Sequence, residues 1–280
     1  MQVRRGGKLE LVGIDVVNST GSSAVFSEGY IAVTNCNFAR CVTGPNVVKR
    51  QRSLEASSLS GRAALFALGG AIQVRGVEAA LESTGSSYVM CAAHLANRAN
   101  GGAVYAAAMV RIDTSRFEAN YVQGVLEASG GALYTEALRM HIISSEFVGN
   151  KAKGLARAYV SYGGAMRLQD CSGFLSTLAT DGTPKFCTVA PTDCAAELRA
   201  VTAVRNVASG SMRAKGGAIY MEFSGLCVNL TDSSFEENAA EDSTGNTEAG
   251  AVQVYEQSLL KIATTRFVRN RAKGATGQVR

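Results

Sequence analysis

One motif recurs along this 280-residue chain and constrains its fold more than any other feature. It is Gly-Gly-Ala followed by an apolar residue, and several copies run on to Phe-x-x-Asn. The motif begins at Gly69, Gly101, Gly130, Gly163 and Gly216, with a variant at Ala249-Gly250-Ala251 and a degenerate form at Ser22-Ser23-Ala24. The steps from 101 to 130, from 130 to 163 and from 216 to 249 are 29, 33 and 33 residues. Such a period indicates a stacked array of similar units.

Within each unit the apolar residues recur at every second position. Val104 and Ala106 alternate with Tyr105, and Ile219 and Met221 alternate with Tyr220. A period of two is typical of a strand with one buried face, and the helical spacing of three and four does not fit. We therefore expect an all-β chain whose units bury their apolar faces by stacking.

The closing motif supplies two further columns of equivalent residues. The fully matching positions are Phe117, Asn120, Phe147, Asn150, Phe235, Asn238, Phe267 and Asn270. Stacked units would place Phe on Phe inside the coil and let the Asn side chains form a hydrogen-bonded ladder. In the unit around "HLANRA" we assign His94 to the Phe column and Asn97 to the Asn column. The pairs Gly130-Gly131 and Gly216-Gly217 suit sharp turns with positive φ and close approach of the next coil.

These patterns predict a parallel β-helix in which each strand pairs with its equivalent ~4.8 Å away in the next coil. We expect a single solenoid domain over residues 1–280 with about seven coils, plus a shortened extra coil at the N-terminus. Two longer steps in the repeat predict inserted loops at about 43–68 and 171–197. Neither end resembles a polar cap, which favours a piece of a longer solenoid.

Charge and cysteine content give weaker indications. The net charge is +5, but the basic run "VVKRQR" lies in a loop-like segment without a nucleic-acid motif, so no nucleic-acid partner is expected. Seven cysteines include no Cys-x-x-Cys pair, and we expect no metal site and no cofactor. A disulfide could join Cys187 to Cys194, or Cys171 to either, although these can equally be small buried hydrophobes. The latter interpretation is favoured for Cys91 and Cys227.

Membrane and targeting signals are also weak. No segment reaches the ~20 uninterrupted apolar residues of a transmembrane helix. The basic start "MQVRRGGKLELVG" lacks the apolar region of a signal peptide, which indicates either a protein that is not secreted or a fragment. The sequons at Asn18 and Asn229 are compatible with secretion.

The repeated Gly-Gly-Ala-[Ile/Leu/Val] with Phe-x-x-Asn resembles the polymorphic outer-membrane protein repeat of chlamydial adhesins and similar pectin-lyase-like proteins. The resemblance covers about residues 22 to 272. It implies a right-handed parallel β-helix and a surface-exposed adhesin associated with an outer membrane. This chain departs from the family pattern because no signal peptide and no C-terminal membrane barrel are visible.

A polysaccharide lyase or glycoside hydrolase is the alternative from a different class, since β-helices often host such enzymes. Those enzymes need paired carboxylates or a carboxylate cluster that binds Ca²⁺. The few Asp residues do not recur in one strand column of neighbouring units. We expect His94 to fill a core column and His141 to lie at a solvent-facing strand position, so no catalytic residue is assigned.

A binding or structural function is therefore favoured, with a cell-surface glycan or protein as partner and a cell-surface or extracellular location. The column between the two apolar strand positions would face outward. It holds Phe26, Tyr105, Tyr134, Arg167 and Tyr220. Exposed aromatic and Arg side chains in a row suit a binding surface, although Tyr can also simply favour strands. These five residues are the predicted binding stripe.

Overall fold

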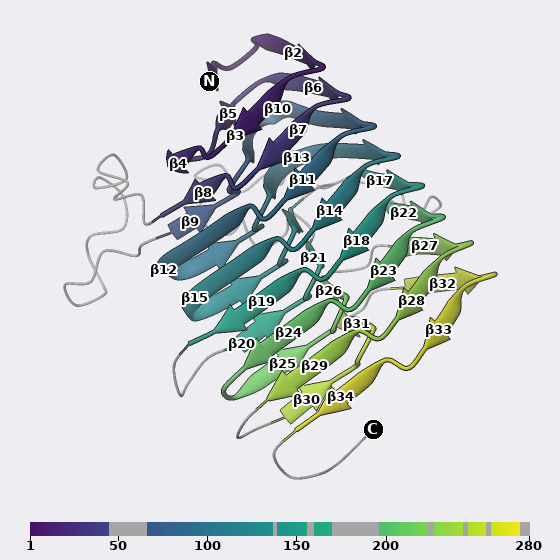
Figure 1. Cartoon of the computed structure of the whole chain (residues 1–280). Coiled ribbons are helices and arrows are strands. Elements are labelled where there is room, and N and C mark those ends of the chain that lie inside the picture. The colour runs from purple at the N-terminus through teal and green to yellow at the C-terminus, as the bar shows by residue number, and fades with distance from the viewer. Residues whose placement is uncertain are drawn as a thin grey trace, which may run out of the picture.

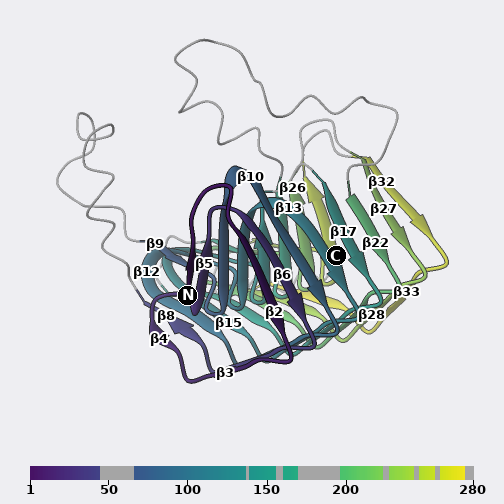
Figure 2. The same ribbon diagram turned by 90° about the horizontal axis from the view of Figure 1, so that it is seen from above.

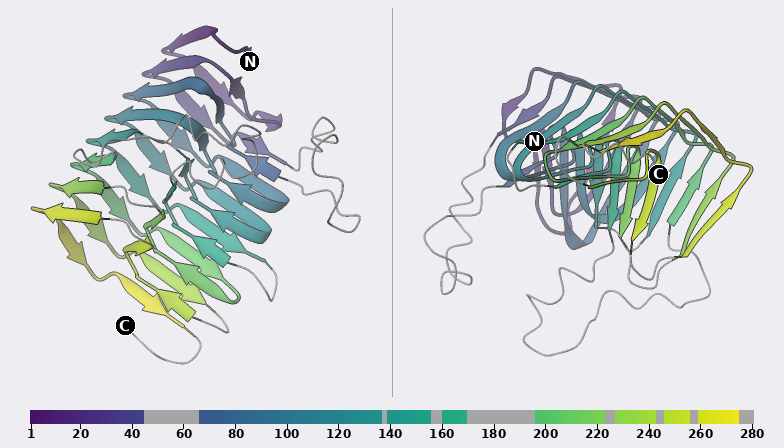
Figure 3. Two further views of the ribbon diagram at one scale, coloured as in Figure 1. Left: turned by 180° about the vertical axis from the view of Figure 1, so that it is seen from behind. Right: turned by 90° about the horizontal axis from the view of Figure 1, so that it is seen from below.

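The computed structural model is a stack of β-coils (Figure 1). It describes residues 1–44, 66–136, 139–155, 160–169, 196–222, 227–242, 246–255 and 259–274. These residues form thirty-four strands and no helix, so none of the described segments could cross a membrane as a helix. The N- and C-terminal coils lie at opposite ends of the stack (Figures 1 and 3).

The strands belong to three sheets in which every pairing is parallel. Sheet A contains β1 (Gln2–Val3), β2 (Lys8–Val12), β5 (Val25–Ser27), β6 (Tyr30–Thr34), β10 (Ile72–Thr84), β13 (Val104–Asp113), β16 (Leu133–Thr135), β17 (Met140–Ile143), β21 (Met166–Gln169), β22 (Ala196–Arg199), β26 (Ile219–Glu222), β27 (Cys227–Thr231), β31 (Val252–Tyr255) and β32 (Leu259–Ala263). Sheet B contains β3 (Asp15–Val17), β7 (Asn37–Ala39), β11 (Ser87–Val89), β14 (Arg116–Glu118), β18 (Glu146–Val148), β23 (Thr202–Val204), β28 (Ser234–Glu236) and β33 (Arg266–Val268).

Sheet C follows sheet B along the chain. It contains β4 (Thr20–Gly21), β8 (Val42–Thr43), β9 (Phe66–Leu68), β12 (Ala92–Asn100), β15 (Tyr121–Ser129), β19 (Lys151–Gly154), β20 (Val160–Tyr162), β24 (Val207–Gly210), β25 (Arg213–Lys215), β29 (Ala239–Asp242), β30 (Asn246–Glu248) and β34 (Arg271–Lys273). Figure 2 looks down the stack, with β2 and β6 on one side, β8, β12 and β15 on the other, and sheet B joining them.

Each coil contributes one strand to sheet B, and the eight strands of this sheet define eight coils. The predicted all-β parallel solenoid is therefore confirmed, and the seven expected coils together with the extra N-terminal coil make up these eight. The extra coil lies at the N-terminus, as expected, where β1 to β4 take places in all three sheets. This first segment is a coil in its own right, because each of its strands pairs with the equivalent strand of the second coil.

Sheets A and C each contain two groups of strands per coil, which we name by their order. The A1 strands follow Gly-Gly-Ala and are β5, β16, β21, β26, β31 and the first parts of β10 and β13; the A2 strands lead into sheet B. The C1 strands belong to sheet C and come directly after the strands of sheet B along the chain. The C2 strands, which precede Gly-Gly-Ala, are β9, β20, β25, β30 and the last parts of β12 and β15.

The main core lies between sheets A and B, and the Phe column runs through it. In register, the column reads Val16, Phe38, Tyr88, Phe117, Phe147, Ala203, Phe235 and Phe267. The rings of Phe117 and Phe147 stack with centroids 4.7 Å apart, and Tyr88 stacks on Phe117 at 4.6 Å. The assignment of His94 to this column is wrong, because Tyr88 occupies that place.

The Asn side chains form the expected ladder, buried at the end of sheet B. Asn150 Oδ1 accepts hydrogen bonds from the backbone N–H and the side-chain amide of Asn120, both at 3.0 Å. Asn150 Nδ2 donates to the Phe117 carbonyl and to Asn206 Oδ1, and the same pattern continues through Asn238 to Asn270. Cys91, not Asn97, holds this position in the third coil, since its N–H donates to Asn120 Oδ1.

Replacing Asn150 with alanine is expected to lower the free energy of unfolding by about 1–3 kcal/mol, because buried backbone groups of Asn120 and Phe117 lose their partners. Urea denaturation followed by circular dichroism would measure the change. Asn97→Ala is the matched control, because Asn97 lies outside the ladder, and its midpoint should stay close to that of the parent. Equal midpoints for both variants would contradict a stabilising ladder.

The paired glycines perform two separate tasks at the turn before each A1 strand. The first glycine of a pair has positive φ, 61° at Gly130 and 64° at Gly216. The second approaches the next coil closely: a Cβ at Gly131 would lie 2.0 Å from the carbonyl oxygen of Gly164, and one at Gly217 equally close to that of Gly250. A larger residue would therefore push adjacent coils apart.

The two predicted insertions fall between β8 and β9 and between β21 and β22. Their predicted bounds were too wide, because Thr43, Phe66–Leu68 and Ala196 belong to strands; residues 45–65 and 170–195 lie outside the described residues. Cys187 and Cys194 also lie outside them. Cys36, Cys41 and Cys91 are free and buried, whereas Cys227 is disulfide-bonded. The interpretation of Cys227 as a simple buried hydrophobe is wrong.

Candidate functional site

The predicted binding stripe faces away from the main core but is not exposed to solvent. The exposed fractions are 5% for Tyr105, 4% for Tyr134, 7% for Arg167 and 2% for Tyr220, and Phe26 is half-buried. The expectation of an exposed stripe is therefore wrong. Alternation correctly separates the two faces of an A1 strand, but it does not reveal whether a second layer covers the outer face.

The C2 strands supply that second layer. Leu68 of β9 packs in one cluster with Tyr105 and Tyr134. Further along the stack, the ring of Tyr162 in β20 lies 4.5 Å from that of Tyr220, and the Lys215 ammonium of β25 lies 6.0 Å from the Tyr220 ring centroid. The stripe is thus an internal layer between A1 and C2.

Arg167 is the centre of this layer. Its guanidinium forms ion pairs with Glu127 and, at 3.0 Å, with Glu222. It also donates a hydrogen bond of 2.8 Å to the Ser129 hydroxyl. Its carbon Cζ lies 4.4 Å from the ring centroid of Tyr162, a cation–π contact that joins the two strand groups.

The electrostatics of the layer indicate a structural role. Burial raises the pKa of Tyr105 and that of Tyr134, so both phenols stay neutral at physiological pH. Burial opposes the charge on Arg167, but the facing Tyr134, Glu127 and Glu222 outweigh it and raise the Arg167 pKa. A paired Arg and neutral tyrosines hold two strand layers together and offer little contact area to a partner.

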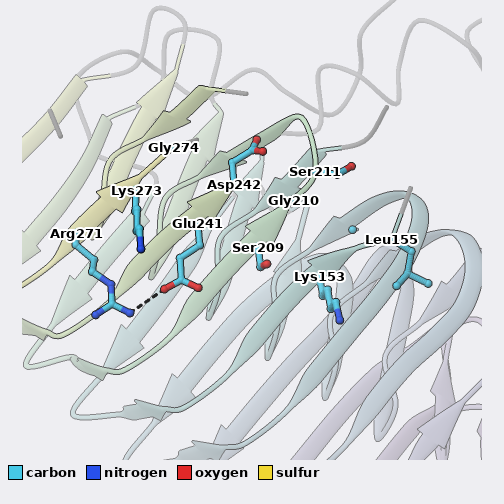
Figure 4. A pocket seen from close by; sticks show the side chains of 11 residues that line it. Lys153, Leu155, Ser209, Gly210, Ser211, Glu241, Asp242, Arg271, Lys273 and Gly274 are labelled. Atoms are coloured by element: carbon cyan, nitrogen blue, oxygen red, sulfur yellow. Dashed lines mark hydrogen bonds and ion pairs between the residues drawn. The ribbon is translucent and has the colours of Figure 1, made fainter. Parts of the chain in front are cut away.

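A surface hollow of about 930 Å³ lies instead on the outer side of the C1 strands (Figure 4). Four of its lining residues form one register column across consecutive coils: Lys153, Ser209, Glu241 and Lys273. The Arg271 guanidinium, in the same hollow, donates a 2.7 Å hydrogen bond to Glu241. Leu155 adds an exposed apolar side chain at one end.

The hollow combines three cations with two carboxylates, since Asp242 lines it as well. Figure 4 shows Lys153 and Lys273 separated by Ser209 and Glu241, so charges of both signs follow one another along the stack. Backbone at Gly154, Gly210 and Gly274 also borders it. This arrangement can bind an extended polar ligand that crosses several coils.

Sequence reasoning did not identify the hollow, although a signal for it exists. Each member of the column lies three residues after a ladder asparagine, as Lys153 does after Asn150 and Lys273 after Asn270. Reading that position through successive repeats would have shown a charged column on a strand face.

The histidines do not form a second site. His141 lies on the outer face of an A2 strand, as expected, with Nδ1 3.2 Å from a carboxylate oxygen of the exposed Glu197. His94 is half-buried in β12 rather than in the core. Among the residues that the structure describes, no group of three or more His, Cys, Asp or Glu side chains could hold a metal ion.

These features define the chain as an all-β solenoid protein with parallel, in-register coils. Comparisons with protein-family models, with curated proteins and with solved structures found no match.

Proposed function

We propose that this protein is a non-enzymatic binding scaffold that acts as an adhesin at the cell surface or in the extracellular space. The observation that carries the proposal is the polar hollow, whose lining includes one register column of polar side chains that crosses four coils of the solenoid. Stacked repeats hold such a row at a fixed spacing, which suits a ligand that is itself a repeating polymer. The resemblance to the polymorphic outer-membrane protein repeat supports the same class of function.

The chemistry of the hollow favours a cell-surface glycan that carries carboxylate or sulfate groups. Lys153, Arg271 and Lys273 can pair with such anions, while Glu241 and Ser209 can bind sugar hydroxyls. The disulfide at Cys227 supports an oxidising compartment, because disulfides persist mainly in secreted and surface proteins. A protein partner that carries an acidic strip is the other candidate.

The double variant Lys153→Ser/Lys273→Ser tests this assignment. Because two of the three cations are lost, binding to acidic glycans on an array, and adhesion to cells that display them, should fall at least about tenfold, equivalent to about 1.4 kcal/mol. Higher salt should weaken the parent more than the variant. The matched control Arg111→Ser/Arg205→Ser removes the same charge from other exposed faces and should bind as the parent does.

Two outcomes would contradict the proposal. Equal loss of binding in the two double variants would show a general charge effect rather than a site. Release of unsaturated or reducing ends from pectins or uronates, abolished by Glu241→Gln, would favour the alternative of a polysaccharide-acting enzyme. That alternative rests on Glu241 and Asp242, two carboxylates that line one hollow.

A further inference from the structure

The outer face of the C1 strands continues beyond the polar hollow, toward the first coils of the stack. The register column of the hollow runs on from Lys153 to Gln123 in β15 and then to His94 in β12. In Figure 1 the strands β12, β15 and β19 lie side by side with the C1 strands that line the hollow. These strands belong to interior coils with further coils on both sides, so their outer face does not depend on either end of the stack.

A second column lies beside the first on this face, two residues earlier in each strand. It places Tyr121 of β15 next to Lys151 of β19, with the small side chains of Ala92 and Val207 before and after this pair. The residues between the two columns, such as Ala152, are fully buried, which directs both columns outward. The face therefore carries two rows of outward side chains with a row of backbone between them.

The two lysines of β19 are available to an anionic ligand. Lys151 and Lys153 lie two residues apart, or about 7 Å along the strand. Neither takes part in an ion pair within the part of the chain that the structure describes. The nearest carboxylate in the column of Lys153 is Glu241, two coils away, and it accepts a hydrogen bond from Arg271. Two ammonium groups thus flank the row of backbone from its two sides.

Tyr121 adds an aromatic ring to this surface. Its side chain is half-buried, and it takes part in none of the ring contacts found among the described residues, whereas Tyr88 and Tyr105 each stack on a neighbour. Burial raises the pKa of Tyr121, so its hydroxyl stays protonated and can donate a hydrogen bond. A ring with a polar tip suits a sugar, which has an apolar face and hydroxyl groups at its edge.

The coil-to-coil step determines how a polymer would meet these side chains. Consecutive coils lie ~4.8 Å apart, which is close to the length of one sugar unit in an extended polysaccharide. A chain that lies along the stack between the two columns would offer about one sugar to each coil. Tyr121 and Gln123 would flank the sugar next to the one held by Lys151 and Lys153, and the chain would continue into the hollow at Ser209.

We propose that the ligand is an extended polysaccharide with carboxylate or sulfate groups, which lies along the stack and reaches from the hollow onto β19 and β15. Tyr121, Gln123 and Lys151 are then binding residues beyond the hollow. Lys151 pairs with an acid group, Gln123 hydrogen-bonds sugar hydroxyls, and the Tyr121 ring stacks on a sugar face. This inference rests on the proposed function, because the same ligand must also occupy the hollow.

A fluorescent reporter tests whether the ligand reaches Tyr121. Because the chain has no Trp, Tyr121→Trp places a single indole at this position. Titration with hexasaccharides of galacturonate, which carry carboxylates, and of heparin, which carry sulfates as well, should change its fluorescence to saturation in at least one series. Tyr30→Trp is the matched control, because Tyr30 is half-buried on the outer face of an A2 strand, and it should not respond.

Binding affinity gives a second readout. Tyr121→Ser and Lys151→Ser should each weaken the binding of the hexasaccharide, measured by titration calorimetry, at least about fivefold. Tyr121→Phe should keep most of the affinity, since it retains the ring. All three variants should keep the sheet spectrum of the parent in circular dichroism, because the changed side chains lie on the outer face.

The outcomes separate this inference from the proposed function. If Lys153→Ser/Lys273→Ser weakens binding while Tyr121→Trp does not respond and Tyr121→Ser binds as the parent does, the hollow remains the site and the extension is overturned. A parent that binds no acidic oligosaccharide overturns both. Polyglutamate that binds as tightly, and loses as much affinity with Tyr121→Ser, would overturn the choice of a polysaccharide.

Discussion

Phe147→Ala is expected to lower the free energy of unfolding by about 3–5 kcal/mol, the usual cost of removing a buried Phe ring. Phe147 is fully buried, and its ring stacks on Phe117. On its other side the column holds the small Ala203, so no large neighbour can move in to fill the cavity. Chemical denaturation followed by far-ultraviolet circular dichroism would measure the loss as a lower urea midpoint.

Phe267→Ala is the matched control within the same column. Phe267 stacks on Phe235 with centroids 5.2 Å apart, but its other face is uncovered in the last coil. Its replacement should cost less than half as much as that of Phe147, measured in the same way. Comparable losses for the two variants would contradict the assigned positions of these rings in the column.

The overall fold could be predicted because two independent periods agree along the chain. Period two within a unit indicates strands, and the recurrence of Gly-Gly-Ala with Phe-x-x-Asn indicates that the strands stack in register. Phe117, Asn120, Phe147 and Asn150 take their predicted places because each residue type suits its position. A ring fills the core, and an amide can donate and accept along a ladder.

The sequence pattern misassigns the third coil because other residue types can fill the Phe and Asn columns. Tyr88 replaces Phe there, and its hydroxyl finds a partner in Ser83 at 2.9 Å. Cys91 replaces Asn, and its backbone N–H still joins the ladder. Tyr88 and Cys91 have the spacing of Phe-x-x-Asn and lie in the two columns. His94 and Asn97 have the same spacing but lie outside both columns.

The binding stripe was misjudged for a different reason. Period two tells which side of a strand faces away from the core, but contacts between A1 and C2 depend on how the chain bends at the paired glycines. Leu68 and Tyr162 reach the stripe from strands that precede those glycines. Whether a second layer covers a strand therefore depends on the path of the whole coil, and the pattern within one strand does not reveal it.

Arg167, at the centre of the layer between the A1 and C2 strands, gives the second prediction of a large loss of stability. Arg167→Met is expected to lower the free energy of unfolding by about 3 kcal/mol, because removing one partner of a buried ion pair leaves the other charge uncompensated. Methionine keeps much of the length of the side chain but none of the charge. The Glu222 carboxylate would then lose its cation, and Glu127 would keep only the exposed Arg98, 3.8 Å away. Both glutamates keep some contact with solvent, which places the expected cost at the lower end for a buried pair.

Arg116→Met is the control that isolates burial from charge. Arg116 also pairs with two glutamates, Glu118 and Glu146, but all three side chains are roughly half exposed, so its loss should cost less than about 1 kcal/mol. Adding Glu127→Gln to Arg167→Met should recover part of the stability, because one of the two largely buried carboxylate charges that faced Arg167 is removed. If Arg167→Met melted with the parent, or if Glu127→Gln worsened it, the A1 and C2 strands would be held together by apolar packing around Leu68 and the tyrosines rather than by the Arg167 ion pairs.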